Sequence, residues 1–432
     1  MNAIAIKTFF TNVKTLIYKY KNTFIEILIA AYFVVCAIER SVFPYTMPDV
    51  CGLLIGWLIP FFLLFGLKIV LDAIERKAIP VSFLCLLGLA VAITLITTKM
   101  DVCFLVFIVG SARGCDVKKI VRNCLIGVGA FYFIVFILSV VGVVPDWSHV
   151  RNGIVRHSYG FDHPTNFACI YMSLALMLLY VRGLKITYYE LAVVLALGGL
   201  IFYLSDGRLA FILVVLAVVI FLVLKLVRID AQKIKDRLPT KIFKWTVIAL
   251  PLILMALSVI LSLIYKYDLG FVNFINEALS GRIELGAQAF ENYGVSVLGQ
   301  NITWFGWGGH GYVPEPENFV YNFVDNGFLR ALFDYGIIAI VLILAGYTMV
   351  ARKTAKNDDL VGLVIFALVL VWAFVEPVLF RNSTNVFIVM LCPYLFFYDL
   401  DLSKFFTKSK SKAKVVSVEE STVKEKEDGL DE

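Results

Sequence analysis

The chain has 432 residues, of which 60% are hydrophobic and only 17% are charged. The hydrophobic residues come in blocks of about 20, the length that a helix needs to cross a bilayer core of roughly 30 Å. This composition excludes a soluble protein divided into globular domains. It predicts one polytopic, all-α membrane domain, because lipid offers no partner for an unpaired backbone group.

The net charge of +6 and the cysteines narrow the class of protein further. Loops between the hydrophobic blocks account for the excess of Lys and Arg, and we find no nucleic-acid-binding motif. The eight cysteines are scattered without a C-x-x-C pair, so the sequence does not indicate a disulfide framework or a metal site. We also find no Rossmann or P-loop glycine pattern, and we expect no cofactor.

Taken in order, the chain divides into three parts. Residues 1–22 are basic and weakly amphipathic and are expected to form a cytoplasmic segment at the membrane surface. Residues 23–402 form the predicted membrane domain, and residues 403–432 are predicted to be a disordered cytoplasmic tail. The twelve predicted spans lie at 24–43, 50–71, 79–97, 100–113, 121–144, 164–181, 187–205, 208–227, 245–265, 327–350, 359–378 and 384–400.

The distribution of Lys and Arg predicts the orientation of these spans. Of the 39 Lys and Arg residues, 29 fall in the N-terminal segment, the tail and alternate connections, and nine fall on the opposite side. The positive-inside rule therefore places both termini in the cytoplasm. It places the long polar loop of residues 267–326 outside the membrane.

Three predicted spans begin at the outer face with a polar signature. Asp162 and His163 precede the span at 164, Ser205-Asp206-Gly207 precedes the span at 208, and Asp325-Asn326 precedes the span at 327. Asp162 or His163 could cap its helix. A helix N-terminus has free N–H groups and a positive dipole end, so it favours phosphate.

Arginines accompany these helix starts, and guanidinium is the preferred bidentate partner of phosphate oxygens. Arg330 lies inside a predicted span, where a charge usually faces a partner or a water-filled cavity. Asp334, one helical turn later, is an alternative partner for a simple salt bridge. The arginines nearest to the polar signatures are Arg151, Arg156, Arg208, Arg282 and Arg330.

Several outer groups are candidate general bases, although each could also be only a cap or a turn residue. No D-x-D pair lies on the outer side, which disfavours a metal-dependent transferase. The candidates are Asp162, His157, His163, Asp206, Asp325 and His310.

The outer loop is rich in aromatic residues, among them Trp304 and Trp307. These rings could form an interfacial belt, or a flat platform for sugar faces and an isoprenoid chain. Within the same loop, residues 282–293 have an amphipathic pattern. They predict a short helix that lies on the membrane or caps a cavity.

Four motifs, in this order along the chain, resemble those of bacterial polysaccharide polymerases of the Wzy type, within the O-antigen polymerase and ligase family. They are residues 159–166, Ser205-Asp206-Gly207-Arg208, Ser280-Gly281-Arg282 with the three residues that follow, and residues 325–336. The last motif is the most specific, and the span count and the late outer loop also fit this family.

The resemblance implies a metal-independent membrane glycosyltransferase of the C type. Its substrates would be undecaprenyl-diphosphate-linked oligosaccharide repeat units in the outer leaflet of the bacterial cytoplasmic membrane. The family's outer-loop arginines hold the diphosphate, which corresponds to Arg282 and Arg208 here and less securely to Arg156; we add Arg330. Asp325, Asp162 and His163 are the expected catalytic groups, and the sugar or lipid contacts are expected at Asn326, His310, Trp304 and Trp307.

Two other functions stay open at this point. Ligases of the family have a His-Asn pair where this chain has Asp325-Asn326, so a ligase that transfers finished glycan is less favoured. A lipid-linked oligosaccharide flippase or solute transporter is less favoured because the polar motifs gather on one face and no repeat is visible. Expected partners are the lipid bilayer, lipid-linked glycans, and a chain-length regulator and a flippase of the same pathway, with no nucleic acid.

Overall fold

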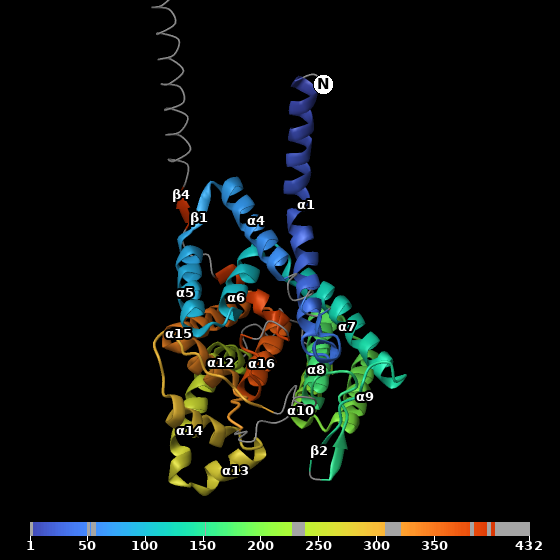
Figure 1. Cartoon of the computed structure of the whole chain (residues 1–432), viewed down its shortest axis with the longest axis vertical. Helices are drawn as coiled ribbons and strands as arrows, with labels where there is room; N and C mark the ends of the chain where they lie inside the picture. The colour runs from blue at the N-terminus through green and yellow to red at the C-terminus, as the bar shows by residue number, and fades with distance from the viewer. Residues whose placement is uncertain are drawn as a thin grey trace, which may run out of the picture.

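The protein is a helical membrane protein, seen here in a computed structural model (Figure 1). The structure describes residues 3–49, 52, 58–151, 153–226, 238–306, 321–380, 384–394 and 399–401. Its α-helices are α1 (Ala3–Ile38), α2 (Phe43–Thr46), α4 (Leu58–Arg76), α5 (Val81–Thr97), α6 (Asp101–Ser111), α7 (Val117–Val140), α8 (Pro164–Arg182), α9 (Tyr188–Ser205), α10 (Arg208–Leu226), α12 (Leu238–Ile264), α13 (Gly270–Ala278), α14 (Arg282–Tyr293), α15 (Gly327–Lys356) and α16 (Leu360–Val375).

The remaining elements are short. The 3-10 helices are η1 (Gly183–Lys185), η2 (Tyr265–Tyr267) and η3 (Val386–Tyr394). The strands are β1 (Ala78–Pro80), β2 (His149–Arg151), β3 (Ile154–Arg156) and β4 (Asp399–Asp401), and β1 pairs with β4 while β2 pairs with β3, both antiparallel. The tail predicted at 403–432 lies outside the described residues, and α1 runs without interruption across the boundary predicted at residue 22.

Seven described helices are long and apolar enough to cross a membrane, which confirms a multi-pass helical membrane protein. They correspond to predicted spans 1, 5, 6, 7, 8, 9 and 10. Three further predicted spans are shorter apolar helices, namely α5, α6 and α16. Helix α6 has only 11 residues, and at 1.5 Å per residue this is about half of a bilayer core.

The prediction of a membrane-spanning α-helix at 384–400 is wrong for the described residues of this range. These residues form η3 and then β4, and not an α-helix. The backbone before η3 has buried side-chain partners: Ser173 donates to the carbonyl of Thr384 at 3.0 Å and Tyr347 to that of Leu379 at 3.2 Å. Non-helical backbone is tolerated at membrane depth where surrounding protein buries it, and residues 384–392 are buried throughout.

Helix α15 is broken near its start. Gly336 has φ 83°, and a side chain there would come within 2.4 Å of the Gly299 nitrogen. The backbone of residues 296 and 297 takes over at the break, accepting hydrogen bonds from the amides of Ile337 at 3.0 Å and Ile338 at 3.2 Å. The first nine residues of α15 therefore form a separate short helix, and residues 296 and 297, in the middle of the predicted outer loop, hold its end.

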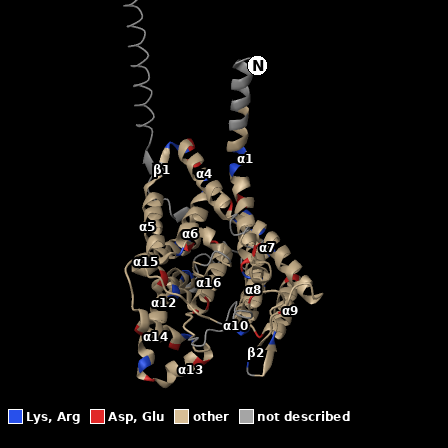
Figure 2. Cartoon of the chain, viewed as in Figure 1, with Lys and Arg blue, Asp and Glu red and all other residues tan. Residues whose placement is uncertain are grey.

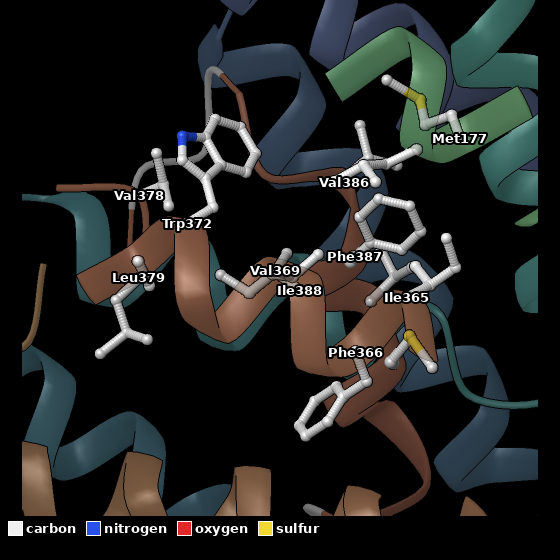
Figure 3. Packing of buried hydrophobic residues seen from close by; sticks show 14 of the residues in the cluster. Met177, Ile365, Phe366, Val369, Trp372, Val378, Leu379, Val386, Phe387 and Ile388 are labelled. Carbon is white, nitrogen blue, oxygen red and sulfur yellow. The ribbon is translucent and has the colours of Figure 1, made fainter. Parts of the chain in front are cut away.

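The core that positions the site centres on α16 and η3. Trp372, Ile365 and Ile388 are almost wholly buried there, and Figure 3 shows them packed among aliphatic and aromatic neighbours. The start of α15 lies against the end of α16, because a Cβ on Gly327 would come within 2.7 Å of the Ala373 carbonyl oxygen and 2.8 Å of that of Glu376. This contact holds the chain before Gly327 close to Glu376.

Different elements lie at the two ends of the molecule. The start of α1 and strands β1 and β4 lie at one end in Figure 1, and α13, α14 and β2 lie at the other. Between them, helices α5 and α16 contain no Lys, Arg, Asp or Glu, and most of the helical ribbon is tan in Figure 2. The helices α13 and α14 of the predicted outer loop therefore lie at the end opposite the start of α1.

Candidate functional site

Three adjoining cavities lie where α1, α8, α10, α14, α15 and α16 meet. The central cavity has a volume of about 380 Å³, the Arg330 cavity about 320 Å³ and the arginine cavity about 50 Å³. Glu39 and Arg40 line both the central cavity and the Arg330 cavity. Thr165, Arg282 and Glu376 line both the central cavity and the arginine cavity, so the three form one connected site.

The arginine cavity brings together side chains from four separate parts of the chain. Among the described residues, it has four arginines against two carboxylates, Asp206 and Glu376. Its other wall is apolar and follows the first turns of α10 and the last turn of α16, through Leu213 and Trp372. The four arginines are Arg151, Arg156, Arg208 and Arg282.

The guanidinium of Arg156, at the end of β3, is positioned by hydrogen bonds to neutral groups. Its Nε donates to the carbonyl of Ser205 at 2.8 Å and its Nη2 to the hydroxyl of Thr165 at 3.1 Å. Burial lowers its pKa, and the like charges of Arg151 and Arg208 act in the same direction. A bound anion would relieve both effects, because it would supply the negative charge that the nearby protein groups only partly provide.

Arg282 is the first residue of α14 and lies at the junction of two cavities. Its Nη2 donates to Glu376 Oε1 at 2.9 Å, its Nη1 donates to the Leu279 carbonyl at 3.2 Å, and its Nε lies 3.5 Å from Asp325 Oδ2. Asn276 of α13 caps this helix by accepting from the first amides of α14, those of Ile283 and Glu284. The predicted helix at 282–293 is confirmed, and its buried face holds the arginine in the cavity.

Arg208 begins α10, as the sequence predicted. Asp206 adopts a left-handed conformation (φ 48°) at the end of α9 and accepts from Arg208 Nε at 3.0 Å. Gly207 lets the turn approach α8, because a Cβ there would lie 2.4 Å from the Ala168 side chain. The side chain of Arg208 is 52% exposed, compared with 13% for Arg282 and 19% for Arg330.

The central cavity is lined by carboxylates. Asp162, Asp325, Glu376 and Glu39 face two arginines, Arg40 and Arg282. Asp162 Oδ1 accepts from Asn166 Nδ2 at 2.7 Å, and its Oδ2 lies 3.8 Å from Arg40 Nη1. The side chain of Asp162 is 5% exposed and that of Asp325 is 22% exposed, so Asp325 is the more accessible of the two.

His163 lines the same cavity but is not arranged as a base. Its Nδ1 accepts the amide of Thr165 at 3.1 Å as the N-cap of α8, so the proton of the neutral ring is on Nε2. Burial lowers its pKa to about 3, with His149 and Arg156 acting in the same direction. The ring is therefore neutral at physiological pH and offers a donor at Nε2.

Asn326 caps α15 from within the protein. Its Oδ1 accepts from the amides of Phe328 and Leu329, both at 3.0 Å, and its Nδ2 donates to Ser258 at 2.8 Å. It is buried and is not among the residues that line the three cavities. The structure thus gives the predicted sugar contact at Asn326 a capping role.

Arg330 lies in a different cavity from Arg156 and Arg208. It pairs with Asp334 at 2.7 Å, the spacing that the sequence offered as its alternative, and Lys99 pairs with the same carboxylate. Trp304 donates to Asp334 at 2.7 Å, and its ring stacks on the guanidinium at 4.4 Å. The aromatic platform predicted at Trp304 therefore supports an arginine, while Trp307 and His310 lie outside the described residues.

The sequence analysis did not name Glu376, Arg40 or Lys99 as site residues. All three line the site. The sequence contains a feature that points to Glu376, because this residue is a lone carboxylate at the end of a long apolar run. Ionisable residues at such positions usually mark a functional site.

No group of His, Cys, Asp and Glu that could hold a metal ion is present in the described part of the chain. The search for relatives returned no match to a protein family model, to a curated protein or to a solved structure.

Proposed function

We propose that the protein polymerises undecaprenyl-diphosphate-linked oligosaccharide repeat units into a surface polysaccharide, by metal-independent glycosyl transfer at the outer face of a bacterial cytoplasmic membrane. The observation that carries the proposal is the arginine cavity. Its guanidinium groups, among them Arg208 and Arg282, line one space that opens into a carboxylate-lined cavity. This arrangement suits a phosphorylated donor beside a hydroxyl acceptor.

The arginine cavity is assigned to the donor. The bond between the anomeric carbon and the phosphate oxygen breaks, and its electron pair leaves with the diphosphate. Arginines that are already in place stabilise the negative charge as it develops. The apolar wall along α10 and α16 gives the isoprenoid chain of the same molecule a surface to lie on.

The central cavity is assigned to the acceptor hydroxyl. Its oxygen bonds to the anomeric carbon while its proton passes to a carboxylate. Asp325 is the assigned base, because it is the more exposed of the two predicted carboxylates and lies beside Arg282. Asp162 is assigned to sugar binding, and His163 contributes its Nε2–H as a donor to the sugar.

The proposal includes an architecture and a topology. The cavities and α13–α14 face outward, and both termini face the cytoplasm, in keeping with the distribution of Lys and Arg. Helix α4 and the shorter elements α5, α6, α16 and η3 complete twelve passes in a fold like that of C-type glycosyltransferases. A flippase would deliver the substrate, and a chain-length regulator would act on the product.

One feature favours a second candidate, a carrier for lipid-linked glycan. Carriers place their sites at broken helices, and α15 is broken at Gly336. The polymerase remains favoured, because the arginine cavity and the central cavity hold carboxylates beside cations and both include Arg282, the first residue of α14. A ligase differs only in its acceptor.

The test uses purified full-length protein and lipid-linked repeat units in detergent, without added metal. A polymerase yields a ladder of lipid-linked glycans together with free undecaprenyl diphosphate, and a chelator has no effect. Product only upon addition of a different acceptor would indicate the ligase. Transbilayer movement in vesicles without any new glycosidic bond would indicate the carrier.

A further inference from the structure

The Arg330 cavity continues into the membrane region as an apolar groove. Phe380 lines both the cavity and a groove of about 60 Å³ between α5, α6 and α15. Ala339 and Val102, next along α15 and α6 from the charged residues, belong to the groove. Leu342 at its edge is 42% exposed, so the groove opens to the side of the protein that faces lipid.

The charged end of this groove has hydrogen-bond donors without acceptors. Arg330 Nη1 is buried and has no partner among the described residues. The Lys99 ammonium has three donors, and two of them are used, by Asp334 and by the carbonyl of Ile302 at 3.2 Å. Trp304 and Phe323 stack on the guanidinium at 4.4 and 4.7 Å and fix its plane.

We infer that the Arg330 cavity and its groove form a second binding site for a polyprenyl diphosphate. Lys99 and Arg330 hold the phosphate oxygens in this site, and the groove holds the first isoprene units. The identification of the ligand as the acceptor's polyprenyl diphosphate rests on the proposed function. The site takes the acceptor's lipid anchor, while the arginine cavity takes the donor's.

The two cavities differ in charge as these two roles require. The Arg330 cavity has three cations and three carboxylates among its described residues, whereas the arginine cavity has four arginines and two carboxylates. The acceptor's diphosphate stays bonded to its sugar and needs only to be bound. The donor's diphosphate gains charge as it leaves and needs the more cationic cavity.

The test counts polyprenyl diphosphate molecules bound to purified full-length protein by native mass spectrometry. We expect two on the wild type, with one lost in the Lys99→Gln/Arg330→Gln double variant. The affinity of the remaining site should be unchanged, and that of the lost site should fall by about tenfold or more. The matching variant Arg156→Gln/Arg208→Gln should lose the other lipid.

A second pair of variants keeps the test independent of the buried charges. Leu342→Trp fills the mouth of the groove and should weaken the second lipid by about tenfold. Val341→Trp is the matched control, because Val341 is 56% exposed on the same helix and does not line the groove. In a further arm, inorganic pyrophosphate replaces the lipid and should bind more weakly and ignore Leu342→Trp.

Three results would overturn the inference: one lipid or none on the wild type, a second lipid that ignores both Lys99→Gln/Arg330→Gln and Leu342→Trp, or pyrophosphate that binds as tightly as the lipid. These outcomes need no turnover. Two bound lipids without any polymer from lipid-linked repeat units would contradict the proposed function and leave the second site in place.

Discussion

The arginine cavity and the Arg330 cavity use the same side-chain chemistry in opposite ways. In the first, Arg156 is held by a carbonyl and a hydroxyl, so its charge stays available to a ligand. In the second, Lys99 and Arg330 both pair with Asp334. That cavity has three cations and three carboxylates among its described residues, so its charge is balanced and it offers a ligand N–H donors rather than net charge. The first arrangement stabilises a charge that develops during reaction, and the second holds a charge that does not change.

Removing Arg282 should have the largest effect, because it contacts both the leaving group and Asp325 in the proposed complex. Arg282→Gln alone would leave Glu376 buried without its cation, so we pair it with Glu376→Gln. We expect kcat to fall about 100- to 1,000-fold, the usual cost of a lost oxyanion donor. Glu376→Gln alone is the control, and a double variant of wild-type rate would remove Arg282 from the mechanism.

Asp325→Asn should also lower kcat by about 100-fold or more, because general base catalysis typically contributes this much. Asp162→Asn should instead raise the KM for the acceptor, since this residue is assigned to sugar binding. Steady-state kinetics with lipid-linked repeat units separate the two. A larger loss of kcat in Asp162→Asn than in Asp325→Asn would exchange their roles.

Arg156→Gln should weaken donor binding by about tenfold, through loss of a charge-assisted contact. The same change at Arg151, whose Nη2 donates to the Ser280 hydroxyl at 3.2 Å, should cost less. Titration with undecaprenyl diphosphate measures both. Equal affinity for wild type and Arg156→Gln would show that this buried charge serves the fold and not the ligand.

Trp304→Phe should reduce acceptor affinity by only a few-fold. It keeps a ring over Arg330 but loses the hydrogen bond to the Asp334 carboxylate, which Lys99 and Arg330 still hold in place. Donor affinity in the neighbouring cavity should not change. A variant that affects both ligands equally would indicate that the two cavities are not separate sites.

The smallest effect concerns acid stability. His163 has a lowered pKa of about 3 in the folded protein against an ordinary 6.5, so folding favours its neutral form. This contribution to the free energy of unfolding is complete above pH 6.5 and is lost as pH falls toward 3. His163→Asn can still cap α8 and should flatten the fall in Tm between pH 7 and 4. Curves of Tm against pH that run parallel for the wild type and His163→Asn would contradict the lowered pKa of His163.

Features set by local sequence could be predicted. Helices α8, α10 and α15 begin at residues 164, 208 and 327, as the polar signatures indicated, and α14 has the predicted bounds. Hydropathy located the seven long spans because each contains an apolar stretch of 18 residues with at most two charged residues. The meeting of Arg208 and Arg282 in one cavity followed from placing their helix starts on the same face.

Features set by long-range contacts could not be predicted. The break at Gly336 depends on residues 296–297, some 40 positions earlier, and the backbone that leads into η3 is bound by polar side chains from α8 and α15. The pairing of Lys99 with Asp334 joins parts of the chain separated by 235 residues. Periodicity carries no information about such pairs. The sequence analysis therefore grouped Arg330 with Arg156 and Arg208, although it lies in a different cavity from them.

The most direct test is an experimental structure of the protein with an undecaprenyl-diphosphate-linked repeat unit bound. We expect both phosphates within hydrogen-bond distance of Arg156, Arg208 or Arg282, and the sugar in the central cavity beside Asp325. A diphosphate bound elsewhere on the protein, with the arginine cavity empty, would contradict the assignment of that cavity to the donor.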